Sequence, residues 1–381
     1  MSVLFEKTTI KGMELKNRLV RSATHEGMAD ANGFPNQRLF KLYERLAKGG
    51  VGLIITGYAF VSRDGISPFP GMLGIDSDEH VPKYQELVEL VHKYGTAIAM
   101  QIAHCGRQTM EAATGSQPIA PSPVEDTTTG VVPREMTEED IERVVEAFSQ
   151  SSRRVKESGF DAIQIHSAHG YLISQFICPH TNRRKDQWGG SIENRMRFVR
   201  KIYEQCRRQV GENYPILIKY SAWDKMKNGL KPEEGVIAGE MMAEMGFDGI
   251  EVSCGIGEDG GSGLLGNAPL GSKPDEGYNR EIAKTLKNRI KTPVFVVGGI
   301  INPTTMADII QCGDADYVSL CRSLISDSQF PMKIQEGDNK PAKCIHCNLC
   351  LGYIATEPLR CYHGKKLKDK EPFLKDILVL E

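Results

Sequence analysis

Eight short apolar segments recur along this chain of 381 residues, each followed by a polar or glycine-rich turn. The residues between them show helical periodicity, as in 137–149, where Ile141, Val145 and Phe148 would share one face. The segments are 19–24, 52–57, 97–102, 161–166, 215–220, 248–253, 293–298 and 316–321. Near-continuous apolar strands that alternate with helices indicate a parallel sheet, and eight of them predict a closed (β/α)8 TIM barrel, an α/β fold.

The two ends of the chain add to this barrel. Residues 1–17 are expected to form a small hairpin that turns at Lys11-Gly12 and closes the bottom of the barrel. We expect a barrel over residues 1–335 and a cysteine-rich C-terminal extension, 336–381, packed on it. Length alone would suggest two or three domains, but barrels reach about 250 residues and grow further by loop insertion.

A doubly wound sheet is the competing fold. Gly255, Gly257 and Gly260 form a GxGxxG pattern after the sixth apolar segment, as in a dinucleotide-binding turn. The residues that follow, GSGLLGNAPLGSKPDEG, contain too much glycine and proline to open a helix. We therefore reject this fold and expect 255–279 to be a mobile loop over the barrel mouth.

Composition excludes several classes of function. The net charge is −2 and the isoelectric point about 6.5, so no electrostatic signature of binding to nucleic acid or to an anionic membrane is present. No run of about eighteen apolar residues could span a membrane, and the N-terminus lacks the apolar stretch of a signal peptide. A cytoplasmic location is expected, where the ten cysteines would be core residues, metal ligands or redox groups rather than disulfides.

Polar and cationic residues collect where the predicted strands end. In a barrel these ends lie on one face, which carries the chemistry. The residues are Thr24, His25, Gln101, His104, His166, His169, Tyr171, Lys219, Gly298, Gly299 and Arg322. Gly298, Gly299 and Arg322 follow the seventh and eighth strands, where barrels bind phosphate through backbone N–H groups and a cation.

Four segments carry a resemblance to a known family. HSAHGYLISQFICPHTNRRKDQWGGSIENRMRF (166–198), KNRLVRSATHEG (16–27), QIAHCGRQ (101–108) and VGGI…CRSLISD (297–327) resemble the old yellow enzyme family of FMN-dependent oxidoreductases. The likeness covers nearly the whole chain and is strongest to the barrel domains of dienoyl-CoA reductase and trimethylamine dehydrogenase. It implies FMN as cofactor, NADH or NADPH as reductant, and a small α,β-unsaturated carbonyl compound as substrate.

The resemblance also assigns flavin contacts. Gln101 would bond the pyrimidine edge of the flavin, and Lys219 stands where most relatives carry arginine. Either cation would stabilise the negative charge that builds on the ring when it accepts hydride. The implied flavin-binding residues are Ser22, Ala23, Thr24, His25, Tyr58, Gln101, Lys219, Gly298, Gly299, Cys321 and Arg322.

Three residues of 166–171 are implied to be catalytic. His166 and His169 resemble the donor pair that grips the carbonyl oxygen of the substrate, where preorganised donors lower the barrier by ~3–4 kcal/mol each. Tyr171 matches the proton donor to the alkene, since a phenol with a pKa near 10 stays protonated at pH 7. Packing against the following helix is the alternative role for Tyr171.

The stretch TNRRKDQWGGSIENR looks catalytic but is expected to be structural. Its arginine and aspartate residues are interpreted as an ionic lock on the fourth loop. Gly189-Gly190 would form a turn, and Ser191 would cap the next helix.

Four cysteines crowd the end of the chain: Cys344, Cys347, Cys350 and Cys361. C-x2-C-x2-C with a distant fourth cysteine is an iron–sulfur spacing more than a zinc spacing. The stretch also resembles the [4Fe–4S] loop of the two relatives, although the gap to Cys361 is shorter and we do not expect the nucleotide-binding domain that exchanges electrons with their cluster. Zinc, with His346 or His363 as a spare ligand, and four plain thiols remain alternatives.

Three functions stay open at this point. The first is an ene-reductase that reduces C=C bonds of unsaturated carbonyl compounds with NAD(P)H. The second is a dehydrogenase subunit that passes electrons through an iron–sulfur centre to a partner protein, and the third is a flavin-binding protein without turnover. The substrate, the choice of NADH or NADPH, and a possible homo-oligomer cannot be predicted from these residues.

Overall fold

The computed structural model describes residues 1–259 and 275–365, and eight of its parallel strands close into a barrel. These strands are β3 (Leu19–Arg21), β4 (Leu53–Ile55), β7 (Ala97–Ala103), β10 (Ala162–Ser167), β11 (Ile216–Ser221), β12 (Gly249–Ser253), β13 (Val294–Val297) and β14 (Tyr317–Leu320). Strand pairing closes the barrel, because β10 pairs with β7 as well as with β11, and β14 pairs with β3. The prediction of a closed barrel is confirmed, and the doubly wound alternative is excluded.

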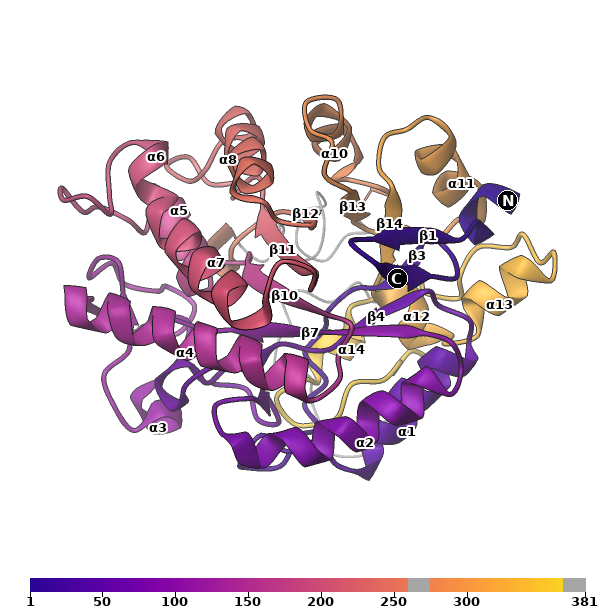
Figure 1. Ribbon diagram of the computed structural model, residues 1–381, viewed down its shortest axis with the longest axis horizontal. Helices are drawn as coiled ribbons and strands as arrows, with labels where there is room; N and C mark the ends of the chain where they lie inside the picture. The colour runs from indigo at the N-terminus through magenta and orange to yellow at the C-terminus, as the bar shows by residue number, and fades with distance from the viewer. Residues whose placement is uncertain (260–274, 366–381) are drawn as a thin grey trace.

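Helices form an outer ring around the strands (Figure 1). The longer ones are α1 (Gln37–Lys48), α2 (Val81–His92), α4 (Glu138–Glu157), α7 (Arg197–Val210), α8 (Pro232–Met245), α10 (Arg280–Lys287) and α11 (Pro303–Gln311). The predicted helix at 137–149 is α4, which begins at the predicted Thr137 cap with its Asp140 capping box and continues to Glu157. Its second half keeps a buried face that includes Ser149, Ser151 and Ser152, and Ser151 donates to the carbonyl of Ile75 at 3.3 Å.

Shorter elements occupy the loops. The helical ones are η1 (Ser2–Phe5), η2 (Arg63–Gly65), η3 (Asp78–His80), α3 (Glu111–Thr114), α5 (Leu172–Ile177), α6 (Ile192–Arg195), η4 (Gly257–Asp259), α12 (Arg322–Ser326), α13 (Phe330–Gln335) and α14 (Leu349–Gly352). The remaining strands are β5 (Ala59–Phe60), β6 (Leu73–Gly74), β8 (Ile119–Ala120) and β9 (Arg134–Glu135). No helix in 1–259 or 275–365 is both long enough and apolar enough to cross a membrane.

The N-terminal hairpin closes one end of the barrel, as predicted. Strands β1 (Thr8–Ile10) and β2 (Met13–Leu15) pair antiparallel, and Lys11 and Gly12 turn between them with positive φ angles. Ile10, Met13 and Leu15 pack with the first inward-facing side chains of the barrel strands. This end is therefore filled with apolar side chains, and the polar strand ends lie at the other.

Alternation along the strands separates two environments. Ala97, Ala99 and Ala162 belong to the cluster inside the barrel, whereas their neighbours Ile98 and Ile163 pack under the helices. Side chains two residues apart along a strand point the same way. The inward positions that come next along β7 and β10 are polar, Gln101 and Gln164. A polar layer consequently lies above the apolar floor.

Candidate active site

One cavity of about 760 Å³ gathers the predicted site residues. This volume is in the usual range for small-molecule sites. The predicted residues in its wall are Ser22, Ala23, Thr24, His25, Tyr58, Gln101, His166, His169, Tyr171, Lys219, Gly298, Gly299, Cys321 and Arg322. His104, which also follows a strand, is not in this wall: it is buried against Asp64, with 3.4 Å between Nε2 and Oδ1.

His166 is held as a neutral donor. The backbone N–H of Ala168 donates to its Nδ1 at 3.1 Å, so the proton of a neutral ring resides on Nε2. Burial, together with the nearby Lys219 cation, lowers the pKa of His166 to about 3. The imidazole is therefore uncharged at neutral pH, and its Nε2–H can donate a hydrogen bond.

His169 occupies a strained backbone position beside it. Its φ of 60° lies in the left-handed region, which costs energy for a residue other than glycine and is common at functional sites. Nε2 lies 2.7 Å from Oγ of Ser253, and the two histidine ring centroids are 5.5 Å apart. Burial, and then the Lys219 cation, keep the pKa of His169 well below its usual value. Two neutral imidazoles are thus held against each other.

Tyr171 begins α5 directly after this turn. Its hydroxyl donates to the hydroxyl of Tyr58 at 3.0 Å, and its ring centroid is 4.9 Å from that of His166. Burial, followed by the interaction with Tyr58, raises the pKa of Tyr171 well above 10. The phenol therefore stays protonated across the physiological range. Tyr58 in turn stacks on His25, with centroids 5.1 Å apart.

The low pKa of His166 predicts how stability depends on pH. Between pH 6.5 and about 3 the unfolded chain binds a proton at this histidine and the folded chain does not, so the free energy of unfolding falls as pH falls through this window. From pH 7 to pH 5 this residue alone should remove about 2 kcal/mol. Urea unfolding at both pH values, compared with a His166→Gln variant, checks this. Equal losses in the two proteins would contradict it.

Lys219 ends β11 inside a buried polar network. Its Nζ donates to Oγ of Ser22 at 2.8 Å and lies 3.5 Å from Oε1 of Glu251. Gln101, on β7, donates from Nε2 to Oε1 of Gln164 at 2.7 Å. Glu251 and Gln164 were not predicted. Both are polar residues that interrupt an apolar strand, a signal visible in GIEVS and AIQIH.

The end of the barrel formed by β13 and β14 has features that suit a phosphate. Gly298 and Gly299 have φ angles of 157° and 61°, so a side chain would strain this turn. Arg322 donates to Oδ1 of Asn348 at 2.6 Å and lines the cavity beside them. Oγ of Ser319 also lines the wall, buried and with no hydrogen-bond partner in the described residues. A cation, a glycine turn and an orphaned hydroxyl fit a phosphate-bearing cofactor such as FMN.

The C-terminal extension forms part of the same cavity. His346, Asn348, Cys350, Leu351, Ile354, Ala355 and Leu359 all line it. The backbone N–H of Leu359 donates to the carbonyl of Glu26 at 2.8 Å, which fixes the extension against the segment that follows β3. The sequence did not indicate that this extension reaches the site.

The four C-terminal cysteines surround a small pocket next to the cavity. Cys344, Cys347, Cys350 and Cys361 all line it, and Cys350 and Arg322 also line the larger cavity. His363 lies in the wall of the small pocket, whereas His346 faces the larger one. Within the parts of the chain that are described, no three histidine, cysteine or acidic side chains are placed to hold one metal ion.

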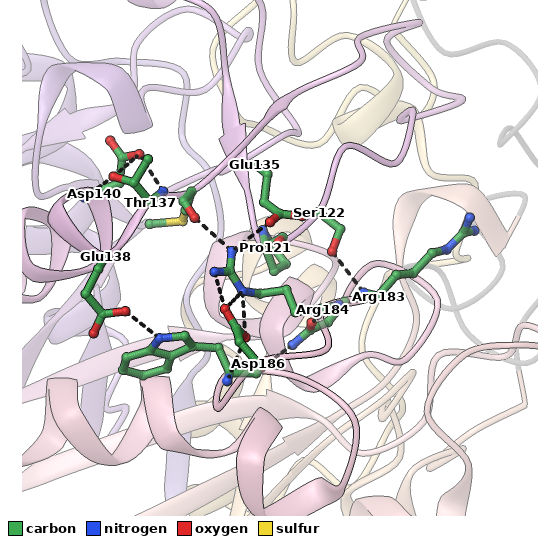
Figure 2. Close-up of polar contacts among 12 residues, drawn as sticks. Pro121, Ser122, Glu135, Thr137, Glu138, Asp140, Arg183, Arg184 and Asp186 are labelled. Carbon is green, nitrogen blue, oxygen red and sulfur yellow. Dashed lines mark hydrogen bonds and ion pairs between the residues drawn. The ribbon is translucent and has the colours of Figure 1, made fainter.

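The expected ionic lock is present on the fourth loop (Figure 2). Arg184 bonds both carboxylate oxygens of Asp186 and donates to the carbonyl of Met136 at 2.8 Å. Trp188 donates from its ring to Glu138 at 2.8 Å, and Ser191 caps α6. These contacts tie the loop after β10 to the start of α4, which supports the structural interpretation of this stretch.

A buried ion pair that was not predicted joins two other loops. Arg107 and Glu258 form an ion pair with both side chains almost fully buried, and Glu258 also accepts from the backbone N–H of Thr127 at 3.0 Å. This pair joins the loop after β7 to the start of the loop after β12. Of that second loop, expected at 255–279, residues 260–274, including Gly260, lie outside the described residues. No local pattern links two residues so far apart in the sequence.

Comparison with known proteins agrees with this geometry. The model of the NADH:flavin oxidoreductase / NADH oxidase family matches residues 3–341. An NADH oxidase of Thermoanaerobacter brockii is 39% identical over 360 residues, which cover 94% of this chain and 54% of that protein. An NADPH dehydrogenase of a Geobacillus species is 37% identical over 332 residues, 87% of this chain and 93% of that protein.

Solved structures of related enzymes superpose on this chain. A 2-naphthoyl-CoA reductase superposes with a TM-score of 0.87 at 26% identity, over 94% of this chain and 56% of that one. Histamine dehydrogenase from Rhizobium sp. 4-9 gives 0.83 at 27% identity, over 94% and 52%. The chain thus spans about half the length of several of its relatives and nearly all of others. It belongs to the NADH:flavin oxidoreductase / NADH oxidase family, the old yellow enzyme family, which implies a flavin and NAD(P)H.

Proposed function

We propose that this protein is an FMN-dependent reductase that uses NAD(P)H to reduce the C=C bond of an α,β-unsaturated carbonyl compound. One observation carries the proposal: two neutral histidines and a protonated tyrosine share a cavity wall with Lys219 and the glycine turn. When bound, FMN would accept hydride from NAD(P)H and deliver it to an alkene carbon. The chain would hold it through Gln101, Lys219, Arg322 and the turn at Gly298-Gly299.

The chain's own residues perform the remaining steps. His166 and His169 would donate hydrogen bonds to the carbonyl oxygen, where negative charge develops as the alkene is reduced. Because both rings are neutral, they stabilise this charge without transferring a proton to it. Tyr171 would then give its phenolic proton to the carbon next to the carbonyl. Its raised pKa prevents loss of that proton before the carbanion develops.

The cofactor can be tested directly. The purified protein should be yellow and, on denaturation, release FMN rather than FAD, because the cavity wall offers one turn suited to a phosphate, at Gly298-Gly299 beside Arg322. Chromatography of the released flavin is the measurement. Recovery of FAD, or no flavin after reconstitution with FMN, would overturn the assignment.

A second candidate function is electron transfer through an iron–sulfur centre to a partner protein. The observation that favours it is the shared wall: Cys350 and Arg322 belong both to the flavin cavity and to the pocket that the four cysteines surround. Cysteine thiolates are the usual ligands of such clusters. The full length of relatives such as the NADH oxidase is also about twice the length matched here.

Metal analysis separates the two candidates. If the cysteines bind a [4Fe–4S] cluster, anaerobically purified protein should contain about four irons and four sulfides per chain. A variant with Cys347→Ser should lose them, whereas Cys312→Ser, at an exposed cysteine outside both cavities, should not. Zinc, or no metal, in the wild-type protein would leave the extension as a structural wall of the reductase site.

A further inference from the structure

A charged group lies behind the cavity wall, in the polar layer inside the barrel. Glu251, on β12, is 1% exposed, and like Gln164 it does not line the cavity. In the register of the sheet it pairs with Lys219 on β11, and Gln164 on β10 pairs with Gln101 on β7. Lys219 and Gln101 do line the cavity. Glu251 therefore reaches the site only through other side chains.

Three side chains converge on this carboxylate. Ser22 donates to Oε1 at 2.6 Å, Gln164 donates to Oε2 at 2.8 Å, and Nζ of Lys219 lies 3.5 Å from Oε1. All three present hydrogens, which matches an ionised carboxylate, an acceptor only. A buried charge with such partners is compensated, and removal of one partner leaves the other uncompensated.

The carboxylate also fixes the direction of the amide chain. Because Glu251 can only accept, Gln164 must turn its NH2 toward it and its Oε1 toward Gln101. Gln101 must then donate its own Nε2 to Gln164, as it does at 2.7 Å. Its amide oxygen is left for a donor in the cavity. The negative charge of Glu251 thus fixes the orientation of the Gln101 amide through Gln164.

We propose that Glu251 is a positioning residue that sets the electron affinity of the bound flavin, by neutralising Lys219 and by fixing the polarity of the Gln164–Gln101 amides. The inference rests on the proposed flavin site. With Glu251 in place, the pair that it forms with Lys219 carries no net charge. Its removal would leave an uncompensated cation in the cavity wall, and an electron-rich flavin would be stabilised.

Sulfite provides a readout that is separate from turnover. It adds to oxidised flavins and leaves negative charge on the ring, so its dissociation constant reports the positive potential of the site. Glu251→Gln, which keeps the shape and removes the charge, should tighten sulfite binding about tenfold or more, since an unpaired cation attracts the anionic ring. Glu251→Asp, which keeps the charge, should stay within about threefold of wild type by the same argument.

A cycle with Lys219→Met shows whether the two charges offset each other at the flavin. Lys219→Met alone should weaken sulfite binding, because Glu251 is left as an unpaired anion, and the addition of Glu251→Gln should bring the affinity back toward that of the wild type. A double variant that binds sulfite as weakly as Lys219→Met, or no tightening by Glu251→Gln in the wild-type background, would overturn the proposal.

The same variants can be compared without flavin. Thermal unfolding of the flavin-free proteins should show each single variant less stable than the double variant, because each leaves a buried charge unpaired and the double variant leaves none. If Glu251→Gln does not fold alone, rescue by Lys219→Met still tests the pairing. Absence of any flavin binding would refute the proposed function, whereas normal FMN content with unchanged sulfite affinity would refute only the role of Glu251.

Discussion

Replacement of Tyr171 by phenylalanine should slow alkene reduction by ~10²–10⁴-fold, if the phenol is the only proton donor. Reduction of the flavin by NAD(P)H should change far less, because that step needs no proton from this residue. Stopped-flow measurement of the two half-reactions separates the steps. The Tyr171 hydroxyl contacts Tyr58, and the Tyr171 ring packs beside that of His166. Phenylalanine keeps the ring contact and removes only the hydroxyl.

A matched control is available at Tyr84. This tyrosine is fully buried, whereas Tyr171 is half-buried at the cavity wall, and it donates to the carbonyl of Gly74 at 2.9 Å, outside the cavity. Tyr84→Phe removes the same atom from a hydrogen-bonded tyrosine outside the cavity and should leave both half-reactions close to wild type. An unchanged rate of alkene reduction in Tyr171→Phe would return Tyr171 to a packing role against α5.

Replacement of His166 by alanine should reduce the rate of alkene reduction by about 10²–10³-fold, the usual cost of removing one preorganised donor to a developing oxyanion. The Nε2–H tautomer fixed by the backbone of Ala168 is what makes this side chain a donor. His166→Asn keeps an N–H donor of similar reach and should recover part of the rate. Single-turnover reoxidation with a panel of enones gives both numbers.

His104 is the control for this second experiment. It is as buried as His166 but contacts Asp64 rather than the cavity, so His104→Ala should cost stability while the chemical step of the folded enzyme is retained. If both histidine variants lose the same activity per folded molecule, the loss at His166 reflects folding and not the stabilisation of charge.

The barrel could be predicted because its strands are buried on both faces. A strand with helices outside and side chains inside reads as a continuous apolar run, and all eight runs form strands. The ends of the strands were predicted less well. The run at 19–24 forms a strand only over Leu19–Arg21, and the side chains of Ser22 and Thr24 contact Glu251 and Cys321 instead. The hairpin at 1–17 was equally readable from its Lys11-Gly12 turn.

The contacts behind the site could not be predicted in the same way. The motifs placed His166, His169 and Tyr171 in the sequence, but the Lys219–Glu251 pair depends on the register between two strands, which no local pattern specifies. The Arg107–Glu258 pair joins loops on different strands, and the cavity wall from the C-terminal extension depends on where a long loop packs. Each of these is a long-range contact whose partners are fixed only after the barrel closes.

The pairing of β3 with β14 links the site to the stability of the barrel. Here the first and last strands of the barrel meet. The backbone N–H of Ser22 donates to the carbonyl of Leu320 at 3.0 Å, and Oγ1 of Thr24 lies 3.1 Å from Sγ of Cys321, although 297 positions separate Thr24 and Cys321 in the chain. All four residues line the cavity. A ligand bound there would contact both strands at once, and it would raise the free energy of unfolding with the logarithm of its free concentration over its dissociation constant. A bound cofactor would therefore also stabilise the closed barrel. Conditions that release the cofactor should weaken the pairing between β3 and β14 first.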